Sequence, residues 1–333
     1  MSNVISKTPV RVSLFGGGTD YREYYHRNRG AVLGTTIDKY VYVSVNTLSD
    51  FFDYKYRVSY SKSELVHEID EIVHPSVREC LRYKNPGHNV DVHIFADLPA
   101  RTGLGSSSTF TVGLLHALAA KAGKMVSKAT LAKDACHVEH TLIQENVGSQ
   151  DQYHAAFGGF NVIEFSENNI NVRPVIISKE KLQTLDSCLM MFFTGMSRLA
   201  HVVVKEQIDK TQNKSNDSYL QQMLQQVEEA EEVISHSAPD QMIEKLGAMM
   251  DHGWHMKKQL SSQISNSVID DAYTRAKQAG AFGGKVCGAG GGGFLLLMVP
   301  PEKQDSVRNA LKDMAEVKFR MENEGSSIIY LRH

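Results

Sequence analysis

Apolar and polar residues alternate along several short stretches in the first half of the chain. The alternation is clear around Val10, Val12 and Leu14, where every second residue is apolar. A period of two residues predicts strands that bury one face against a core. We therefore expect antiparallel strands over residues 10–14, 37–45, 56–60, 90–94 and 161–165.

Helical patterns of apolar residues separate and follow these strands. One helix is expected from about Ser107, and another from about Ser127 to Glu145. The second half has longer helical patterns between a few apolar strands. There the sequence predicts helices over 217–236, 239–260 and 267–279 and one after Pro300, and strands over 188–193, 294–299 and 327–331.

The composition limits the classes of protein to which the chain can belong. A length of 333 residues favours two domains, each with its own core. The net charge of −2 comes from scattered charges, which argues against a nucleic-acid-binding surface. The longest apolar run is too short to span a membrane, and no apolar block follows the first Met, so we expect a cytoplasmic protein. The four cysteines and 14 histidines lack metal-ligand spacing.

Residues 99–109 carry the strongest chemical signal. This stretch, Pro-Ala-Arg-Thr-Gly-Leu-Gly-Ser-Ser-Ser-Thr, joins a strand to an apolar helix. Gly103 and Gly105 allow the backbone to approach a ligand closely, and a helix that begins in the following serines offers free N–H groups to an anion such as phosphate. An ordinary glycine turn with serine caps explains the stretch equally well when it is considered alone. It matches neither the P-loop nor the dinucleotide fingerprint, because Ser108 stands where the latter needs glycine.

Three further segments contain candidate functional residues, each with a plain structural alternative. Arg11 shares a strand face with Ser13, and the strand ends in a triple glycine before Asp20, which could simply cap that turn. Glu139 and Asp151 are 12 residues apart and could be a solvated carboxylate and a turn residue. The glycine cluster over 283–293 could serve only close packing.

Together these segments resemble the three motifs of the GHMP kinases, the superfamily of galactokinase, homoserine kinase and mevalonate kinase. The motifs match Thr8–Asp20, Pro99–Ser108 and Gly288–Gly293 in the usual order. The resemblance implies an α+β, two-domain GHMP kinase fold. Residues 1–180 would form a domain like domain 2 of ribosomal protein S5, and residues 181–333 a ferredoxin-like domain. A nucleotide would lie in the cleft between them.

The details of the motifs resemble one branch of that superfamily, the D-glycero-D-manno-heptose 7-phosphate kinases. Galactokinases have Glu-His where this chain has Gly17-Gly18, whereas Thr36–Val43 and Gln150–Phe160 fit the heptose branch. The resemblance implies ATP-dependent phosphorylation of the anomeric 1-hydroxyl, giving a heptose 1,7-bisphosphate for nucleotide-activated heptose and surface polysaccharide synthesis. The alternatives are a fucokinase-like kinase of a free sugar, or a non-catalytic relative that binds a sugar or nucleotide.

The resemblance also implies roles for individual residues. Asp151 would accept or orient the proton of the attacking hydroxyl, and Arg11 would hold Asp151 and stabilise charge on the transferred group. Glu139 would bind Mg²⁺ together with the hydroxyl of Ser107. The same Glu–Asp spacing of 12 occurs in galactokinases. The ATP phosphates would contact the backbone of Gly103, Leu104, Gly105, Ser106, Ser107 and Ser108.

The sugar phosphate is expected at the end of the first motif. Gly18, Thr19 and Asp20 would contact sugar hydroxyls. A cationic pocket must hold the distal phosphate, and an arginine fork suits it best. The candidates are Arg101, Arg198 and Arg22. The sequence does not decide between a monomer and a homodimer.

Overall fold

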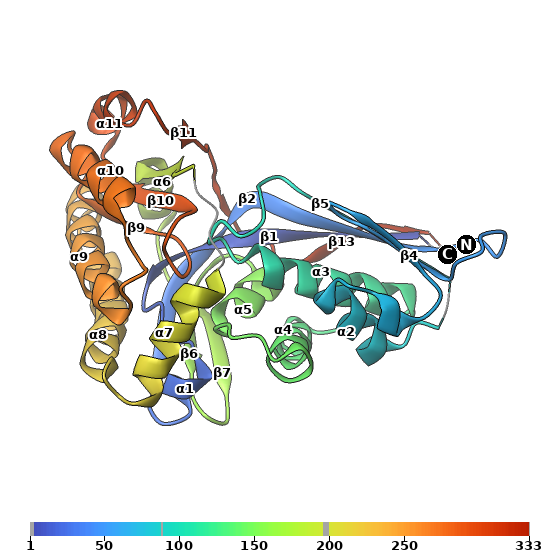
Figure 1. The fold of residues 1–333 in the computed structure, drawn as a ribbon. Coiled ribbons are helices and arrows are strands. Elements are labelled where there is room, and N and C mark those ends of the chain that lie inside the picture. The colour runs from blue at the N-terminus through green and yellow to red at the C-terminus, as the bar shows by residue number, and fades with distance from the viewer. Residues whose placement is uncertain (1–2, 88, 196–199, 333) are drawn as a thin grey trace.

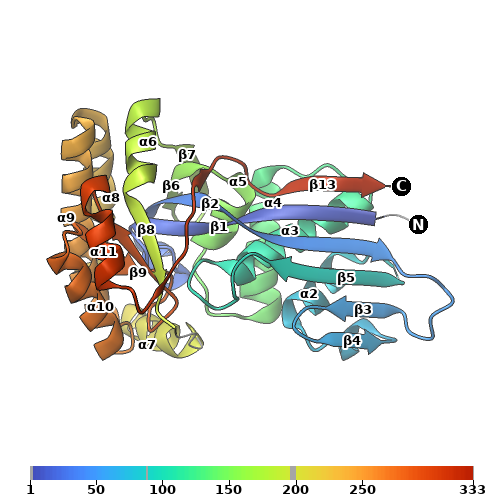
Figure 2. The ribbon, with the colours of Figure 1, turned by 90° about the horizontal axis from the view of Figure 1, so that it is seen from above.

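A computed structural model describes residues 3–87, 89–195 and 200–332. A long mixed sheet with helices beneath it meets a smaller helix-covered sheet at one end (Figure 1). The strands of the large sheet run in the order β13-β1-β2-β5-β3-β4, with β6 and β12 also paired to β2 and β7 paired to β6 (Figure 2). Their bounds are β1 Asn3–Phe15, β2 Gly30–Thr47, β3 Tyr56–Ser59, β4 Ser63–Val66, β5 Val90–Ala96, β6 Phe160–Phe165, β7 Ile170–Pro174, β12 Met321–Glu322 and β13 Ser327–Arg332.

All five strands expected in the first half are present, but one pairing differs from the prediction. β3 pairs parallel to β5, and it is antiparallel only to β4. The reason is the helix α2 (Pro75–Lys84), which follows β4 and returns the chain so that β5 starts at the same end as β3. A parallel pair needs such a crossover.

Helix α3 (Ser106–Lys121) is the centre of the helical layer. It packs on β1 and β2 and is flanked by α2, α4 (Lys128–His137) and α5 (Gln150–Phe157). Because both of its faces are covered, apolar residues such as Val112, Leu114 and Leu115 are buried all round it. The sheet and these neighbours thereby fix the direction in which the first turn of α3 points.

The smaller sheet has the ferredoxin-like topology that we expected. Its strands are antiparallel and run in the order β11-β8-β10-β9, with helices between the first and second and between the third and fourth along the chain. The predicted helices over 217–236, 239–260 and 267–279 all lie in the first of these connections. The bounds of this unit are β8 Leu189–Phe193, α7 Ala200–Gln212, α8 Asp217–His236, α9 Pro239–Leu260, α10 Ser267–Gln278, β9 Gly283–Val286, β10 Phe294–Met298, α11 Gln304–Ala310 and β11 Ala315–Glu316. Two helices lie outside it, α1 Arg22–Tyr25 and α6 Lys179–Cys188.

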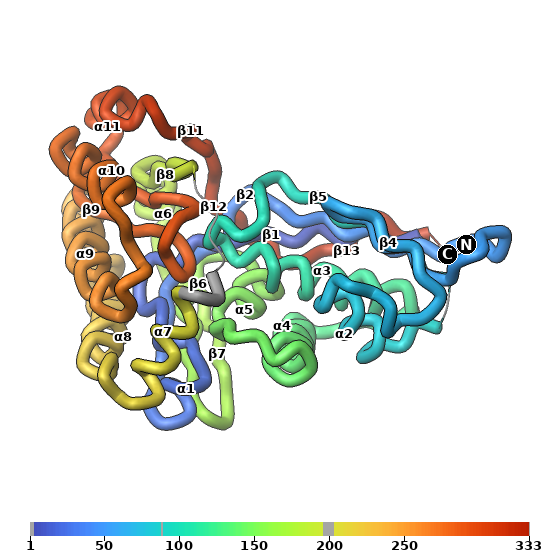
Figure 3. Tube along the Cα trace, viewed as in Figure 1, coloured from blue at the N-terminus to red at the C-terminus, as the bar shows by residue number. Residues whose placement is uncertain are grey.

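The end of the chain returns to the large sheet. β13 pairs with β1, and β12 pairs with β2, so both termini lie at the far end of the sheet from the smaller unit (Figure 3). Residues 321–332 therefore do not belong to the ferredoxin-like unit, contrary to a division into 1–180 and 181–333. The position of the boundary near residue 180 stays a prediction.

Two further features concern the cysteines and the apolar character of the helices. All four cysteines are buried as free thiols. Among the described residues, no helix combines the length and the apolar character that a membrane crossing requires.

Candidate active site

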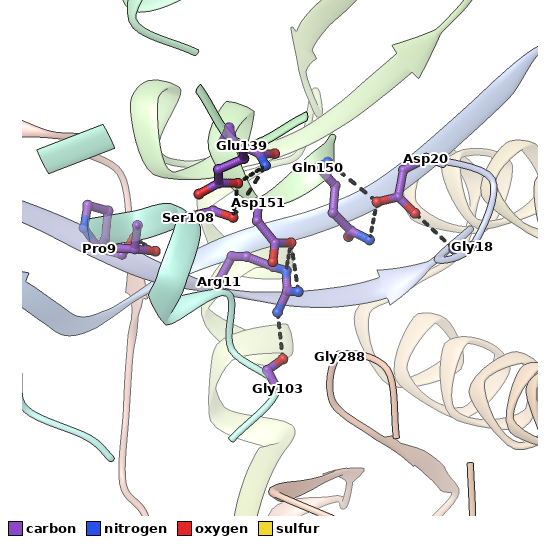
Figure 4. Close-up of polar contacts among 12 residues, drawn as sticks. Pro9, Arg11, Gly18, Asp20, Gly103, Ser108, Glu139, Gln150, Asp151 and Gly288 are labelled. Atoms are coloured by element: carbon purple, nitrogen blue, oxygen red, sulfur yellow. Dashed lines mark hydrogen bonds and ion pairs between the residues drawn. The ribbon is translucent and has the colours of Figure 1, made fainter. Parts of the chain in front are cut away.

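Arg11 connects three parts of the site. Its side chain projects from β1, where the pairing with β2 is irregular between Pro9 and Arg11, and it is only 4% exposed. Arg11 Nε and Nη2 lie 2.8 and 2.7 Å from Asp151 Oδ1, and Nη1 donates to the carbonyl of Gly103 at 2.7 Å (Figure 4). The Arg11 backbone N–H also donates to the Leu104 carbonyl at 3.1 Å. The arginine thus holds Asp151 and the glycine–serine loop in one fixed arrangement.

Asp151 lies directly against the start of α3. It stands in the first turn of α5, not in the loop before that helix. Gly105, the residue before α3, has a φ of +76°, and a β carbon there would come within 2.8 Å of Asp151 Oδ2. Only glycine permits this close approach. The first N–H groups of α3, which have no partners within the helix, therefore adjoin the carboxylate.

The glycine-rich segment after β9 packs against the glycine–serine loop. A β carbon on Gly288 would lie 2.6 Å from the Cα of Gly103, and one on Gly103 would collide with the Cys287 carbonyl. The buried Nζ of Lys257 fixes this segment by donating to the carbonyls of Val286 and Gly288 at 2.9 and 2.5 Å. Two motifs that are far apart in the sequence thus form adjacent surfaces.

Glu139 is completely buried beside the same helix start. The regular helix predicted over 127–145 ends at His137, and residues Val138–Ile143 continue as a π-helix that carries Glu139. Such widened turns are frequent at functional sites. Glu139 Oε2 accepts hydrogen bonds from Ser108 Oγ at 2.8 Å and from Gln152 Nε2, while Oε1 has no partner among the described residues. Burial raises the pKa of this carboxyl from 4.5 to about 7, against the opposing effect of its hydrogen bonds.

Ser107 and Ser108 face different ways at the start of α3. Ser107, the hydroxyl expected at the metal, is exposed. Ser108 is buried and contacts Glu139, a role that we had not assigned to its side chain. Gln152 was also missed, although the Asp-Gln pair that it forms with Asp151 was visible in the sequence. The expected role of Ser107 stays a prediction.

The end of the first motif is occupied by contacts within the protein. Asp20 Oδ1 accepts from the Gly18 N–H at 2.9 Å, and Oδ2 accepts from Gln150 Nε2 at 2.9 Å. Burial raises the pKa of Asp20. Thr19 is fully buried, and its hydroxyl bonds to the backbone of Gly16 and Ala31, so it supports the turn. The expected contacts of Gly18, Thr19 and Asp20 with the sugar stay predictions.

The three candidate arginines for a distal phosphate are in different surroundings. Arg198 lies outside the described residues, and Arg101 is exposed with a φ of +63°. Arg22 is half-buried, and its Nε has no partner among the described residues. It lines a cavity of about 220 Å³ together with His26, Lys133 and His137. Among the described residues, neither Arg101 nor Arg22 forms a hydrogen bond or ion pair with Arg11 or Asp151.

Comparisons with known proteins show which family the chain resembles. The model of the GHMP kinases N terminal domain matches residues 71–159, and that of the GHMP kinases C terminal region matches residues 231–317. The chain is 29% identical over 322 residues to the D-glycero-alpha-D-manno-heptose 7-phosphate kinase of Campylobacter jejuni, covering 94% of each protein. It is 26% identical to the mevalonate kinase of Pyrococcus furiosus, over 93% of this chain and 92% of that protein.

The fold is also similar to solved structures. The crystal structure of a D-glycero-D-manno-heptose 1-phosphate kinase from Bacteroides thetaiotaomicron matches with a TM-score of 0.79. The match covers 99% of this chain and all of that one, at 22% sequence identity.

Proposed function

The chain belongs to the GHMP kinases, a family of phosphotransferases that use ATP, and from this premise we propose that it phosphorylates a sugar. The acceptor that we propose is the anomeric 1-hydroxyl of D-glycero-D-manno-heptose 7-phosphate, and the product is the 1,7-bisphosphate. Two observations support this choice: the similarity to a heptose 7-phosphate kinase along the whole chain, and a first motif that lacks the Glu-His of galactokinases. Such a product serves the synthesis of nucleotide-activated heptose.

The observation that carries the proposal is the Arg11–Asp151 pair held against the first turn of α3. Phosphoryl transfer requires positioning and charge stabilisation more than covalent chemistry. The free N–H groups of that turn suit the ATP phosphates, because the helix start carries partial positive charge. The guanidinium of Arg11 adds a fixed positive charge beside the group being transferred.

Asp151 is the proposed proton acceptor. In the reaction, the anomeric oxygen forms a bond to the γ-phosphorus while the bond from that phosphorus to the β,γ-bridging oxygen breaks, and the hydroxyl proton moves to Asp151. An anomeric hydroxyl is more acidic than an ordinary alcohol, so a carboxylate suffices as the base. Arg11 orients the carboxylate through two contacts to one of its oxygens, which leaves Oδ2 on the side of Gly105.

The residues around Glu139 are suited to bind the Mg²⁺ ion of Mg·ATP. This ion prefers oxygen ligands, keeps several waters and takes one or two carboxylates in addition to phosphate oxygens. Glu139 supplies an oxygen without a partner, and the Ser107 and Ser108 hydroxyls lie at the adjoining helix start. Within the described residues no group of three or more His, Cys, Asp and Glu side chains gathers as a metal site of its own. When bound, Mg²⁺ would neutralise phosphate charge.

A substrate panel tests the proposal directly. Purified protein with Mg·ATP is offered heptose 7-phosphate, the free heptose and fucose, and ADP release is measured for each. We expect the highest kcat/KM with heptose 7-phosphate. A preference for a free sugar would identify a fucokinase-like enzyme instead. A protein that binds ATP but phosphorylates none of these sugars would contradict the proposal.

The variant Asp151→Ala separates an enzyme from a non-catalytic binding protein. Turnover should be lost while ATP binding, measured by calorimetry, remains. Activity that survives this substitution would remove Asp151 from the reaction.

A further inference from the structure

A cavity of about 220 Å³ lies between α1, α4, the start of α5 and the hairpin that joins β6 to β7 (Figure 1). Four basic side chains line it: Arg22 and His26 from α1 and its C-terminal cap, and Lys133 and His137 from α4. Pockets for drug-sized ligands have volumes of about 300–1,000 Å³. This cavity is therefore suited to a small ion or to one group of a larger molecule.

The basic side chains of the cavity lack acidic partners. Within residues 3–87, 89–195 and 200–332, no carboxylate forms an ion pair with any of the four, whereas Arg27 on the neighbouring surface pairs with Asp217 at 2.6 Å. The acidic residue of the described lining is Glu167, which is exposed in the hairpin. Even with both histidines neutral, Arg22 and Lys133 outweigh this single carboxylate. The cavity thus carries uncompensated positive charge.

The effect of this charge is visible on the groups around it. Burial lowers the pKa of the adjacent His140 from 6.5 to about 4, and the positive charges of Arg22 and His26 add to this shift. Burial raises the pKa of Tyr25, and its neighbours Ser149 and Arg22 oppose that rise. Arg22 Nε is itself buried without a partner among the described residues. Buried polar groups are normally paired, so an unpaired guanidinium nitrogen at a positively charged cavity indicates an anionic ligand.

The cavity is separate from the reacting groups. Its lining does not include Arg11, Asp20 or Asp151. Tyr25 and Ser149 are buried at its inner end, and their hydroxyls share a hydrogen bond of 3.0 Å. The backbone N–H of Ser149 donates to the Asp20 carbonyl at 2.9 Å. The Tyr25–Ser149 pair therefore lies between the cavity and the first motif.

We propose that this cavity binds a phosphate group of a ligand other than the phosphoryl acceptor. A phosphate group carries nearly two negative charges near neutral pH, which matches the guanidinium fork of Arg22 and the point charge of Lys133. A metal cation fits poorly, because the basic groups repel it and the described residues gather no set of three His, Cys, Asp or Glu ligands. The inference assigns Arg22 to this second site and does not depend on which acceptor the enzyme phosphorylates.

The test measures binding of inorganic phosphate by calorimetry, with Mg·ADP present to occupy the start of α3. We expect one saturable site, and a Tm that rises by about 2 °C or more at a phosphate concentration tenfold above the Kd. Sodium chloride at the same ionic strength should not reproduce this rise. Arg22→Met and Lys133→Met should each raise the Kd about tenfold or more, as expected for the loss of a charged hydrogen bond. If phosphate does not bind, or binds both variants unchanged, the inference is overturned.

Lys128→Met is the matched control, because it removes the same charge from the same helix. Lys128 Nζ donates to the Phe157 carbonyl at 2.7 Å and does not line the cavity. Charges outside the site are screened by salt, so this variant should change the Kd for phosphate by less than about twofold. If it weakens binding as much as Lys133→Met does, the overall charge of the protein attracts phosphate and the cavity is not a site.

Kinetics with the proposed acceptor identify the source of the phosphate. In phosphate-free buffer, Lys133→Met should leave the KM values for heptose 7-phosphate and for the free heptose unchanged. A rise confined to heptose 7-phosphate would place the acceptor's own phosphate in the cavity and would overturn the second site. If the unmodified protein phosphorylates no sugar, the proposed function has failed, whereas the calorimetric result decides the phosphate site by itself.

Discussion

The pair of Arg11 and Asp151 allows a quantitative test of the site. Asp151→Asn keeps the shape of the side chain but removes the charge that faces the guanidinium. The Arg11 side chain is only 5% exposed, so its charge would remain poorly solvated, with the Gly103 carbonyl at 2.7 Å as its other acceptor. Breaking a fully buried pair costs about 3–5 kcal/mol. The Asp151 side chain is 22% exposed, so water screens part of the interaction. We therefore expect Asp151→Asn to lower the free energy of unfolding by about 2 kcal/mol.

A double-mutant cycle isolates the interaction between the two side chains. Arg11→Met removes the guanidinium. In that background, Asp151→Asn should lower the free energy of unfolding much less than it does in the unmodified protein. The free energy of unfolding of all four proteins is measured in urea near neutral pH without ligands. We expect a coupling energy of about 1–2 kcal/mol. If the changes in unfolding free energy of the two single variants sum to that of the double variant within about 0.5 kcal/mol, the stabilising contact is refuted.

The same four proteins test the catalytic role of the pair. Loss of a positioned proton acceptor lowers kcat by about 10²–10⁴-fold. Arg11 both holds Asp151 and stabilises charge on the transferred group, so the double variant should be slower than either single variant but should lose less than the product of the two single losses. A kcat for Asp151→Asn within about tenfold of the unmodified protein would refute the assignment.

Three further changes have defined outcomes. Gly105→Ala places a β carbon 2.8 Å from Asp151 Oδ2 and should lower kcat by more than about tenfold, whereas Gly123→Ala, at a φ of +66° with open space, should only reduce stability. In Mg²⁺-free buffer the protein should lose stability as the pH rises from 4.5 to about 7, because folded Glu139 retains a proton that the unfolded chain releases; urea unfolding of Glu139→Gln should lack this loss. Burial lowers the pKa of His154 from 6.5 to about 3, so stability should fall as the pH drops below 6.5, and acid unfolding of His154→Gln should show a smaller fall.

Local patterns in the sequence predicted the individual elements well. Helices α8 and α9 begin and end where their apolar periodicity and flanking residues indicated, and the strand–glycine–helix order around Gly103 and Gly105 was also visible. These features depend on neighbours in the chain. Periodicity, turn residues and helix caps report such short-range preferences directly.

The features that sequence reasoning missed depend on contacts between distant residues. The parallel pairing of β3 with β5 follows from the path of α2, and the π-helix at Glu139 places that carboxylate opposite Ser108 and Gln152. No local pattern encodes either arrangement.

The pairing of β13 with β1 has a consequence for synthesis on the ribosome. β1 carries Arg11, yet one of its edges acquires its hydrogen-bonding partner only when residues 327–332 are available. Until then a nascent chain exposes an open strand edge, the kind of surface that recruits other chains. The sheet that carries Arg11 is therefore complete only after residues 327–332 have been made, and removal of β13 would leave that edge of β1 unpaired while β2 still covers the other edge.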